Sequence, residues 1–140
     1  MTPQETYRSA TAASWSRIDM LLALYHETEI AMQAAQDAHT EGNGTEYAKQ
    51  HVRTIRLLLA ILEGINPEHD EISRNVRDLC VFIIREFSNM SQPSLTSALN
   101  VLRTLKQSFE EIREEANRLE QAGHIPKLST TALELNIAIG

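Results

Sequence analysis

One stretch of the sequence, Thr54 to Leu62, carries more apolar side chains than a one-sided surface helix needs. Seven of the eight residues from Ile55 to Leu62 are apolar. At about 100° per residue, a single helix face is predicted to turn six apolar side chains toward a core: Val52, Ile55, Leu58, Leu59, Leu62 and Ile65. Leu57 and Ile61 fall roughly opposite. Because a helix with two apolar sides needs cover on both, the stretch predicts a second contact besides the core.

The remainder of the chain predicts an all-α fold. Its 140 residues include only five Gly and four Pro, so the connections between periodic segments are few and short. Gly64 with Pro67, and Gly123 with Pro126, have the chemistry of helix ends. We predict an antiparallel four-helix bundle whose helices cover about residues 16–39, 46–64, 71–88 and 92–122.

The third and fourth predicted helices differ in how clearly they define an inward side. In the fourth, one face of a helix about 28 residues long carries nine apolar positions: Leu95, Ala98, Leu99, Leu102, Leu105, Phe109, Ile112, Ala116 and Leu119. In the third, the expected inward residues are Val76, Leu79, Cys80, Ile83 and Phe87. Val81 and Phe82 then remain outside the core face, as a second surplus of apolar side chains.

Both ends of the chain differ from the predicted bundle. Residues 1–14 are rich in Ser, Thr and Ala and are predicted to form an N-terminal arm, the bundle to span 15–123, and 124–140 to form a short C-terminal extension. From Leu133 to Ile139 every second residue is apolar, which is the period of an extended strand. We expect this segment either to be disordered, as termini often are, or to lie in an apolar groove of its own or a neighbouring molecule, where it would mimic a partner.

Charge and hydropathy exclude several classes of partner. The chain has 13 basic and 19 acidic residues, a net charge of −6, with no Lys/Arg-rich block, so we expect no nucleic-acid partner. No segment approaches about 20 uninterrupted apolar residues, so no membrane insertion is expected. The beginning of the sequence lacks the apolar core of a signal peptide, and the expected location is the cytoplasm.

The sequence also lacks the usual motifs of catalysis and cofactor binding. Cys80 is the lone cysteine, which excludes a disulfide within the chain and a thiolate metal cluster. Neither Glu-x-x-His, nor a Gly-rich phosphate loop, nor Gly-x-Ser-x-Gly occurs. His51 is better explained as a boundary or core residue than as a phosphoacceptor. We expect no metal, no cofactor and no enzymatic activity.

The surplus apolar residues on the second and third helices predict a site for another polypeptide. We expect a groove lined by Thr54, Leu57, Ile61, Val81 and Phe82, with Tyr7 of the N-terminal arm covering it in the free protein. One alternative is that the same residues form a homodimer interface in a structural bundle. Another is that they are ordinary surface residues or pack against the two ends of the chain.

Four short segments of the sequence resemble a known family. An early Tyr7 and Ser14-Trp15 are followed by Met20-Leu21-Leu22-Ala23-Leu24-Tyr25. The segment from Asn75 to Ile83 and the pattern Leu102-x-x-Leu105-x-x-x-Phe109-x-x-Ile112 come later, in the same order. Together, over about residues 7–120, they are similar to the flagellin secretion chaperones, the FliS family. The chain departs from that family at Trp15, Glu27 and Phe109, and it lacks the Gly-Gly that often precedes the third helix.

This resemblance implies a cytoplasmic helical chaperone for flagellar type III export. Such a protein binds the disordered C-terminal region of flagellin in apolar grooves, prevents premature filament assembly and presents its cargo to the export gate. The expected partners are therefore the C-terminal segment of flagellin and the flagellar export gate, with a weak homodimer as a further option. The alternative function is that of a homo-oligomerising structural bundle without an exported client.

Overall fold

A computed structural model describes residues 17–68 and 70–123. These residues form five helices and no strand: α2 (Arg17–Thr40), α3 (Gly44–Glu63), α4 (Glu71–Ser88), α5 (Gln92–Glu111) and α6 (Arg113–Gln121). The prediction of an all-α fold is confirmed. Tyr7 and the alternating segment from Leu133 to Ile139 lie outside the described residues, so the predictions about them stay untested.

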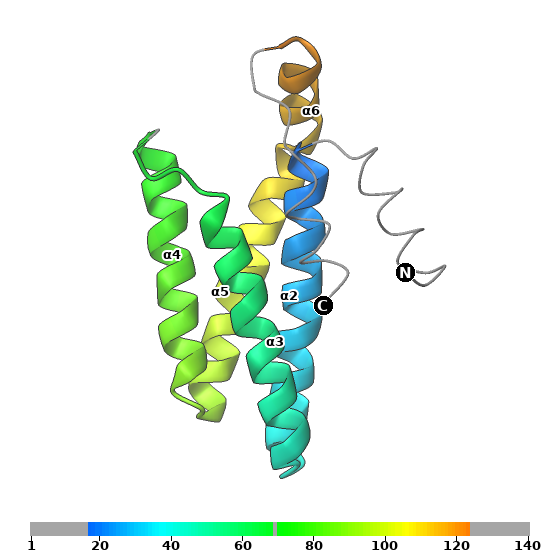
Figure 1. Cartoon of the computed structure of the whole chain (residues 1–140), viewed down its shortest axis with the longest axis vertical. Coiled ribbons are helices and arrows are strands. Elements are labelled where there is room, and N and C mark those ends of the chain that lie inside the picture. The colour runs from blue at the N-terminus through cyan, green and yellow to red at the C-terminus, as the bar shows by residue number, and fades with distance from the viewer. Residues whose placement is uncertain (1–16, 69, 124–140) are drawn as a thin grey trace, which may run out of the picture.

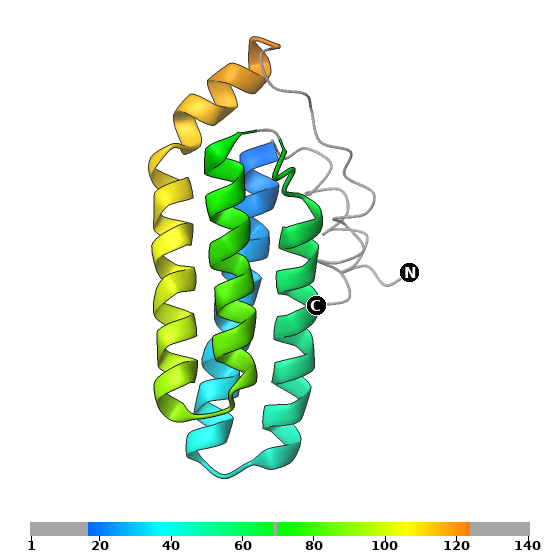
Figure 2. The same cartoon turned by 90° about the vertical axis from the view of Figure 1, so that its left-hand side faces the viewer.

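The four longer helices stand side by side, and successive helices run in opposite directions (Figure 1). α2 packs closely on α3 and α5, α4 packs on α5, and α4 approaches α3 least closely of these neighbours. The view in Figure 2 places α4 in front, between α5 and α3, with α2 behind. None of the described helices is both long and apolar enough to cross a membrane.

A polar residue caps the start of each of α3, α4 and α5. The side chain of Asn43 accepts a hydrogen bond from the Glu46 amide at 3.1 Å, and that of Asp70 accepts one from the Ser73 amide at 2.7 Å. Ser91 accepts from Ser94 at 3.3 Å. Each bond satisfies an amide that has no partner within the first helical turn. α4 consequently begins and ends at the predicted residues, and α2 and α3 lie within two residues of their predicted bounds.

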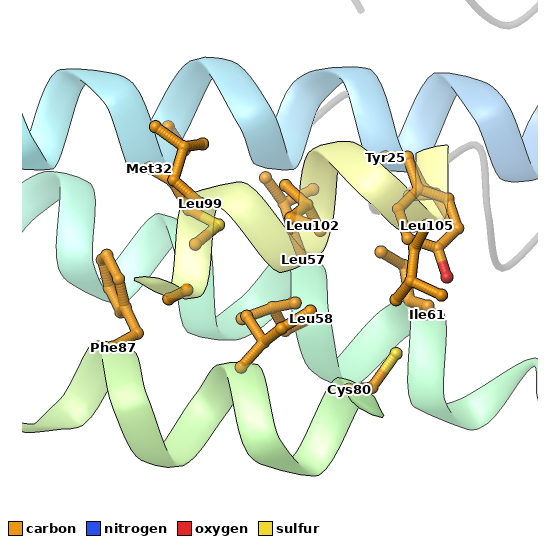
Figure 3. Packing of buried hydrophobic residues seen from close by; sticks show 14 of the residues in the cluster. Tyr25, Met32, Leu57, Leu58, Ile61, Cys80, Phe87, Leu99, Leu102 and Leu105 are labelled. Atoms are coloured by element: carbon orange, nitrogen blue, oxygen red, sulfur yellow. The ribbon is translucent and has the colours of Figure 1, made fainter. Parts of the chain in front are cut away.

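The prediction for the inward side of α3 is wrong. Leu57, Leu58 and Ile61 are buried, with 2%, 0% and 1% of their surface exposed. Figure 3 shows these three side chains in the same core as Met32 of α2 and Leu102 of α5. Val52 and Leu59, which the sequence placed inside, are 49% and 48% exposed. Leu58 is inside as predicted, but the helix is rotated so that Leu57 and Ile61, predicted to lie opposite the core, are buried beside it.

Polar contacts on α3 explain this rotation. Arg53 donates from Nη2 to Glu27 Oε2 of α2 at 2.6 Å, which holds one flank of α3 against α2. Thr54 is completely buried, yet its hydroxyl donates to the Gln50 carbonyl at 2.8 Å within the same helix. A threonine bonded in this way leaves no unpaired donor in the core, so its polarity does not keep it at the surface.

The fourth predicted helix is two helices, which corrects the single segment expected over about 92–122. α5 ends at Glu111 and α6 begins at Arg113, with Ile112 between them at φ −100° and ψ 4°. Glu110 with Glu114, and Glu111 with Glu115, would be like-charged pairs four residues apart in a continuous helix, and such pairs destabilise it. The buried carboxylate of Glu120 instead accepts a hydrogen bond from the Arg17 amide at 2.9 Å, and Arg113 pairs with Asp19. These contacts hold α6 across the start of α2.

We predict that truncating adjacent leucines of α3 has very different effects on stability. Leu58→Ala removes a fully buried side chain and leaves a cavity, so the free energy of unfolding should fall by about 2–5 kcal/mol. Leu59→Ala, the matched control, should change it by about 0.5 kcal/mol or less because Leu59 is half exposed. Urea denaturation followed by circular dichroism measures both. Equal losses at the two positions would contradict the observed rotation of α3.

A second prediction concerns Met90 in the turn between α4 and α5. Its φ of +56° is in the left-handed region, where a side chain beyond Cα costs about 1 kcal/mol or more. Met90→Gly should therefore stabilise the protein by about 1 kcal/mol, measured as a shift of the urea midpoint. Met90→Ala keeps a Cβ atom and should give no such gain. A gain of the same size in both variants would point to the exposed methionine side chain rather than to the backbone.

Candidate partner-binding faces

The exposed apolar side chains of α3 lie on one side of that helix. Val52 and Leu59 are seven residues apart and therefore share a face. Ile55 and Leu62 lie between this exposed row and the core, partly buried against it. The outer row of α3 thus continues directly into the core.

Contacts on either side of α3 show which neighbour this row faces. The Arg53–Glu27 ion pair marks the flank toward α2. His51 stacks on Phe87 of α4, with ring centroids 4.8 Å apart and 15° between the planes, which marks the opposite flank. Ile55 and Leu62 follow His51 by four and eleven residues and share its side of the helix. Ile55 and Leu62 consequently lie on the side of α4, whereas Val52 and Leu59 point away from the core next to them.

α4 presents apolar residues on both of its flanks. Cys80, Ile83 and Phe87 are completely buried and define its core side. Val81 directly follows Cys80 and Ile84 directly follows Ile83, so both side chains are rotated by about 100° around the helix axis to one side of the buried stripe. Leu79 directly precedes Cys80 and Phe82 directly precedes Ile83, so these two are rotated by the same angle to the other side. Because the right-handed helix α4 runs antiparallel to α3, the first pair is on the α3 side and the second on the α5 side (Figure 2).

Two surfaces follow from this arrangement. The α3/α4 face comprises Val52, Ile55, Leu59, Leu62, Val81 and Ile84. The α4/α5 face comprises Ile72, Leu79 and Phe82 of α4, together with Val101 and Ile112. The α3/α4 face coincides with the neighbouring helix pair that approaches least closely. It is therefore the less closely packed of the two faces.

The residues predicted from the sequence to line a groove do not come together. Thr54, Leu57 and Ile61 are buried in the core and cannot contact a partner, so their prediction as groove residues is wrong. Val81 is partly buried and Phe82 is 40% exposed, but the two lie on different flanks of α4. Leu79, expected inside, is 41% exposed.

Sequence reasoning missed Val52 and Leu59 as surface residues because it assigned them to the core. The signal that could have found them is the position of Arg56 and Glu63, which lie next to the exposed row on the outer side of the helix. Charged residues are almost never fully buried without a partner. Their positions on the helix therefore indicate the outer side of α3 better than the apolar residues do, since those occur all around it.

An aromatic cluster closes the end of the bundle near the α4–α5 turn. Tyr47 lies between His39 and His51, with ring centroids 5.5 and 5.8 Å away, and Gln92 of α5 donates to His39 Nδ1 at 2.7 Å. Burial lowers the pKa of His51 and raises that of Tyr47. Among the described residues, His51 Nδ1 and the Tyr47 hydroxyl have no hydrogen-bond partner. The cluster is a packing element whose partly buried imidazole, that of His51, disfavours protonation.

Two other places were candidates for chemistry. Tyr25 is buried beside the Cys80 thiol (Figure 3), and burial raises the pKa of Cys80 to about 11, so this thiol is not a nucleophile near neutral pH. A shallow hollow beside Leu22 and His26 is lined by charges that are already paired, such as Lys106 with Glu29 at 3.2 Å. Within 17–68 and 70–123, no group of three His, Cys, Asp or Glu side chains is placed to hold a metal ion.

Comparison with known proteins adds no further identification. The sequence matches none of the family models with which it was compared, and a search of curated proteins finds no match either. The resemblance to the flagellin chaperones therefore stays a prediction from the sequence motifs.

The environment of His51 predicts a loss of stability in mild acid. Its pKa in the folded protein lies below the ordinary value of 6.5, so below that pH the unfolded chain binds more protons than the folded one. The stability is fully present above about pH 6.5 and declines as the pH falls toward the lowered pKa. His51→Phe keeps a ring on Phe87 and should flatten the dependence of unfolding free energy on pH between about 7 and 5. An unchanged slope in the variant would show that other groups cause it.

Proposed function

We propose that this protein is a cytoplasmic export chaperone that binds the disordered C-terminal region of flagellin. In this role it would prevent premature polymerisation and support flagellar type III secretion, presenting its cargo to the export gate. The motifs at Tyr7, at Met20 to Tyr25 and at Leu102 to Ile112 support this family assignment. The proposed contact surface is the α3/α4 face, which replaces the groove predicted from the sequence. The role requires no catalytic residue, metal or cofactor.

One observation carries the proposal: an exposed row of apolar side chains on α3 continues through Ile55 and Leu62 to the flank that faces its most loosely packed neighbour, α4. Val52 and Leu59 are about half exposed and lie seven residues apart. An apolar row of this kind is the surface that an amphipathic or extended segment covers when it binds a bundle. A disordered flagellin segment has the flexibility to follow such a row and fold on it.

The energetics require a partner longer than the exposed row itself. Burying a Val or Leu side chain completely contributes roughly 1.5–3 kcal/mol, so covering the exposed halves of Val52 and Leu59 contributes about that much for the pair. Association costs on the order of 4–15 kcal/mol. Stable binding therefore needs further contacts, which Ile55, Leu62 and Ile84 provide next to the row. A segment of several helical turns meets this requirement, whereas a short peptide does not.

The alternative function is a homo-oligomerising bundle that uses the same face for a second copy of the chain. It needs no client and is supported by the same exposed residues. The two functions differ in what the α3/α4 face contacts, so they are distinguished by adding flagellin and by measuring the oligomeric state without it.

We predict that a peptide covering about the last 40 residues of flagellin from the same genome binds with a favourable enthalpy and gains helix. Calorimetric titration and circular dichroism measure these effects. Leu59→Asp should weaken the affinity at least about 10-fold, because it places a charge in the apolar row. Ile30→Asp is the matched control, since Ile30 is also exposed, at 44%, but belongs to α2, diagonally across the bundle from α4. Both variants should melt at nearly the same temperature as the parent.

The result that overturns the proposal is absence of binding, or an equal loss of affinity in the two variants. Sedimentation at several concentrations then tests the alternative. A dimer that persists at nanomolar concentration and is disrupted by Leu59→Asp alone would show that the face pairs with a second copy.

A further inference from the structure

α4 separates the charged residues of its surface by sign. Val81 lies on the side of α3, with Arg77 four residues before it and Arg85 four residues after it. Arg74 lies seven residues before Val81. Residues at these spacings share one side of a helix, so all three arginines are on the α3 side of α4. Guanidinium groups therefore border the α3/α4 face along its α4 edge.

The opposite flank of α4 carries acidic groups instead. Asp78 and Glu86 lie four residues before and after Phe82, which is on the α5 side, and Glu71 lies eleven residues before it. The other exposed positions of this flank are uncharged: Ile72, Asn75 and Leu79. The α3 side is thus the basic side of α4, in a chain whose net charge is −6.

Two of the three arginines have no carboxylate partner. Arg77 bonds Asp78, the next residue, at 3.0 Å. Arg74 and Arg85 are exposed and form no ion pair with any residue that the structure describes. Helix stability does not explain Arg74, because it lies near the N-terminus of α4, where the helix dipole disfavours a cation. Basic residues elsewhere each pair with a carboxylate: Arg53, Arg103, Lys106, Arg113 and Arg118.

The α3 side of the face supplies apolar contacts and no net charge. Val52 and Leu59 are 49% and 48% exposed. Arg56 and Glu63 lie next to this row and have opposite charges. Because these two charges cancel, the arginines of α4 determine the sign of the whole face. A partner therefore meets an apolar row on one helix and positive charge on the other.

The apolar row and the arginines lie level with each other. His51 stacks on Phe87, and α3 and α4 run in opposite directions (Figure 1). Counting from this stack, Val52 is near the level of Arg85, and the other end of the row approaches the level of Arg74. The two arginines are eleven residues apart, about 16 Å along the helix. One partner helix of about three turns can therefore contact both rows at once.

We propose that the segment bound at the α3/α4 face is an amphipathic helix with carboxylates along one flank. Its apolar side covers Val52 and Leu59, and its carboxylates pair with Arg74 and Arg85. Arginine suits this contact because its planar guanidinium group binds a carboxylate through two parallel hydrogen bonds. The inference rests on the proposed function, since it concerns the same face, and it adds which part of the cargo the face selects.

The same charges disfavour a second copy of the chain as the occupant. In a twofold dimer the same surface of both copies comes together. Arg74 and Arg85 of one copy would then lie opposite the arginines of the other, and like charges repel. An acidic helix turns this unpaired charge into attraction, so it is the occupant that the face fits.

Two synthetic helical peptides test this preference directly. Both have five turns and the same row of leucines, and they differ only in carrying Glu or Lys along one flank. An ion pair on a protein surface changes an affinity by up to about fivefold. Two such pairs should therefore make the Glu peptide bind the full-length protein at least about 10-fold more tightly than the Lys peptide. Fluorescence anisotropy at low salt measures both affinities.

The double variant Arg74→Glu, Arg85→Glu should reverse the preference in favour of the Lys peptide. Lys49→Glu with Arg118→Glu is the matched control, because it changes the net charge equally on other surfaces. Lys49 shares the side of Arg53, toward α2, and Arg118 belongs to α6. The control should keep the preference for the Glu peptide. Arg74→Lys with Arg85→Lys should retain most of it, because the charge remains while the paired hydrogen bonds are lost.

Equal binding of the two synthetic peptides, binding of neither, or a preference unchanged by the double variant would overturn the inference. Self-association of the protein alone that the double variant abolishes would assign the arginines to a second copy, and would also overturn it. Thermal melting of each variant checks that the fold is intact.

The C-terminal flagellin peptide separates this inference from the proposed function. Affinity for flagellin that falls at least about 10-fold in Arg74→Glu, Arg85→Glu, but not in the matched control, supports both. Flagellin bound equally by both variants would overturn the inference and leave the proposed function standing. A preference for the Glu peptide without any binding of flagellin would support the inferred specificity of the face and overturn the proposed function.

Discussion

The orientation of α3 about its own axis is the constraint on which the rest of the structure depends. Arg53 holds one flank of this helix to Glu27 of α2, and His51 holds the other to Phe87 of α4. Between these contacts only Leu57, Leu58 and Ile61 can fill the centre of the core. Val52 and Leu59 must then remain outside, although they are as apolar as the residues inside. The candidate site is therefore a consequence of how α3 is fixed by its neighbours.

α4 divides the exposed apolar surface into two parts because of its position between α3 and α5. The consecutive residues Val81 and Phe82 lie on opposite flanks of its buried stripe. The close packing of α4 on α5 and its looser approach to α3 make the two faces physically different. One lies along the helix pair that packs less closely, while the other lies along a closely packed pair. We propose the first, the α3/α4 face, as the surface that contacts flagellin.

The bend at Ile112 shows a local conflict resolved by distant contacts. The glutamates around it weaken a continuous helix, and nothing nearby in the sequence is a conventional helix stop. The buried Glu120 carboxylate accepts a hydrogen bond from the amide of Arg17, the first residue of α2, which lies 103 positions earlier in the chain. It thereby satisfies an amide that has no partner within the first turn of α2. α6 thus stabilises the start of α2 and does not continue the apolar stripe of α5.

The sequence by itself determined the all-α class, the bounds of α4 and the buried stripe of α5 from Leu95 to Leu105, because there apolar and polar residues alternate with a clear helical period and helix ends carry capping residues. It could not determine which side of α3 is buried. Seven apolar residues among eight leave the rotation of that helix undefined, and it is decided by Glu27 and Phe87, which lie 26 and 36 residues away from the residues they contact. Only the tertiary structure could therefore show that Leu57 and Ile61 are buried and that Val52 and Leu59 are at the surface. The reason is that side-chain contacts between helices, and not local periodicity, set the rotation of a helix that is apolar on every side.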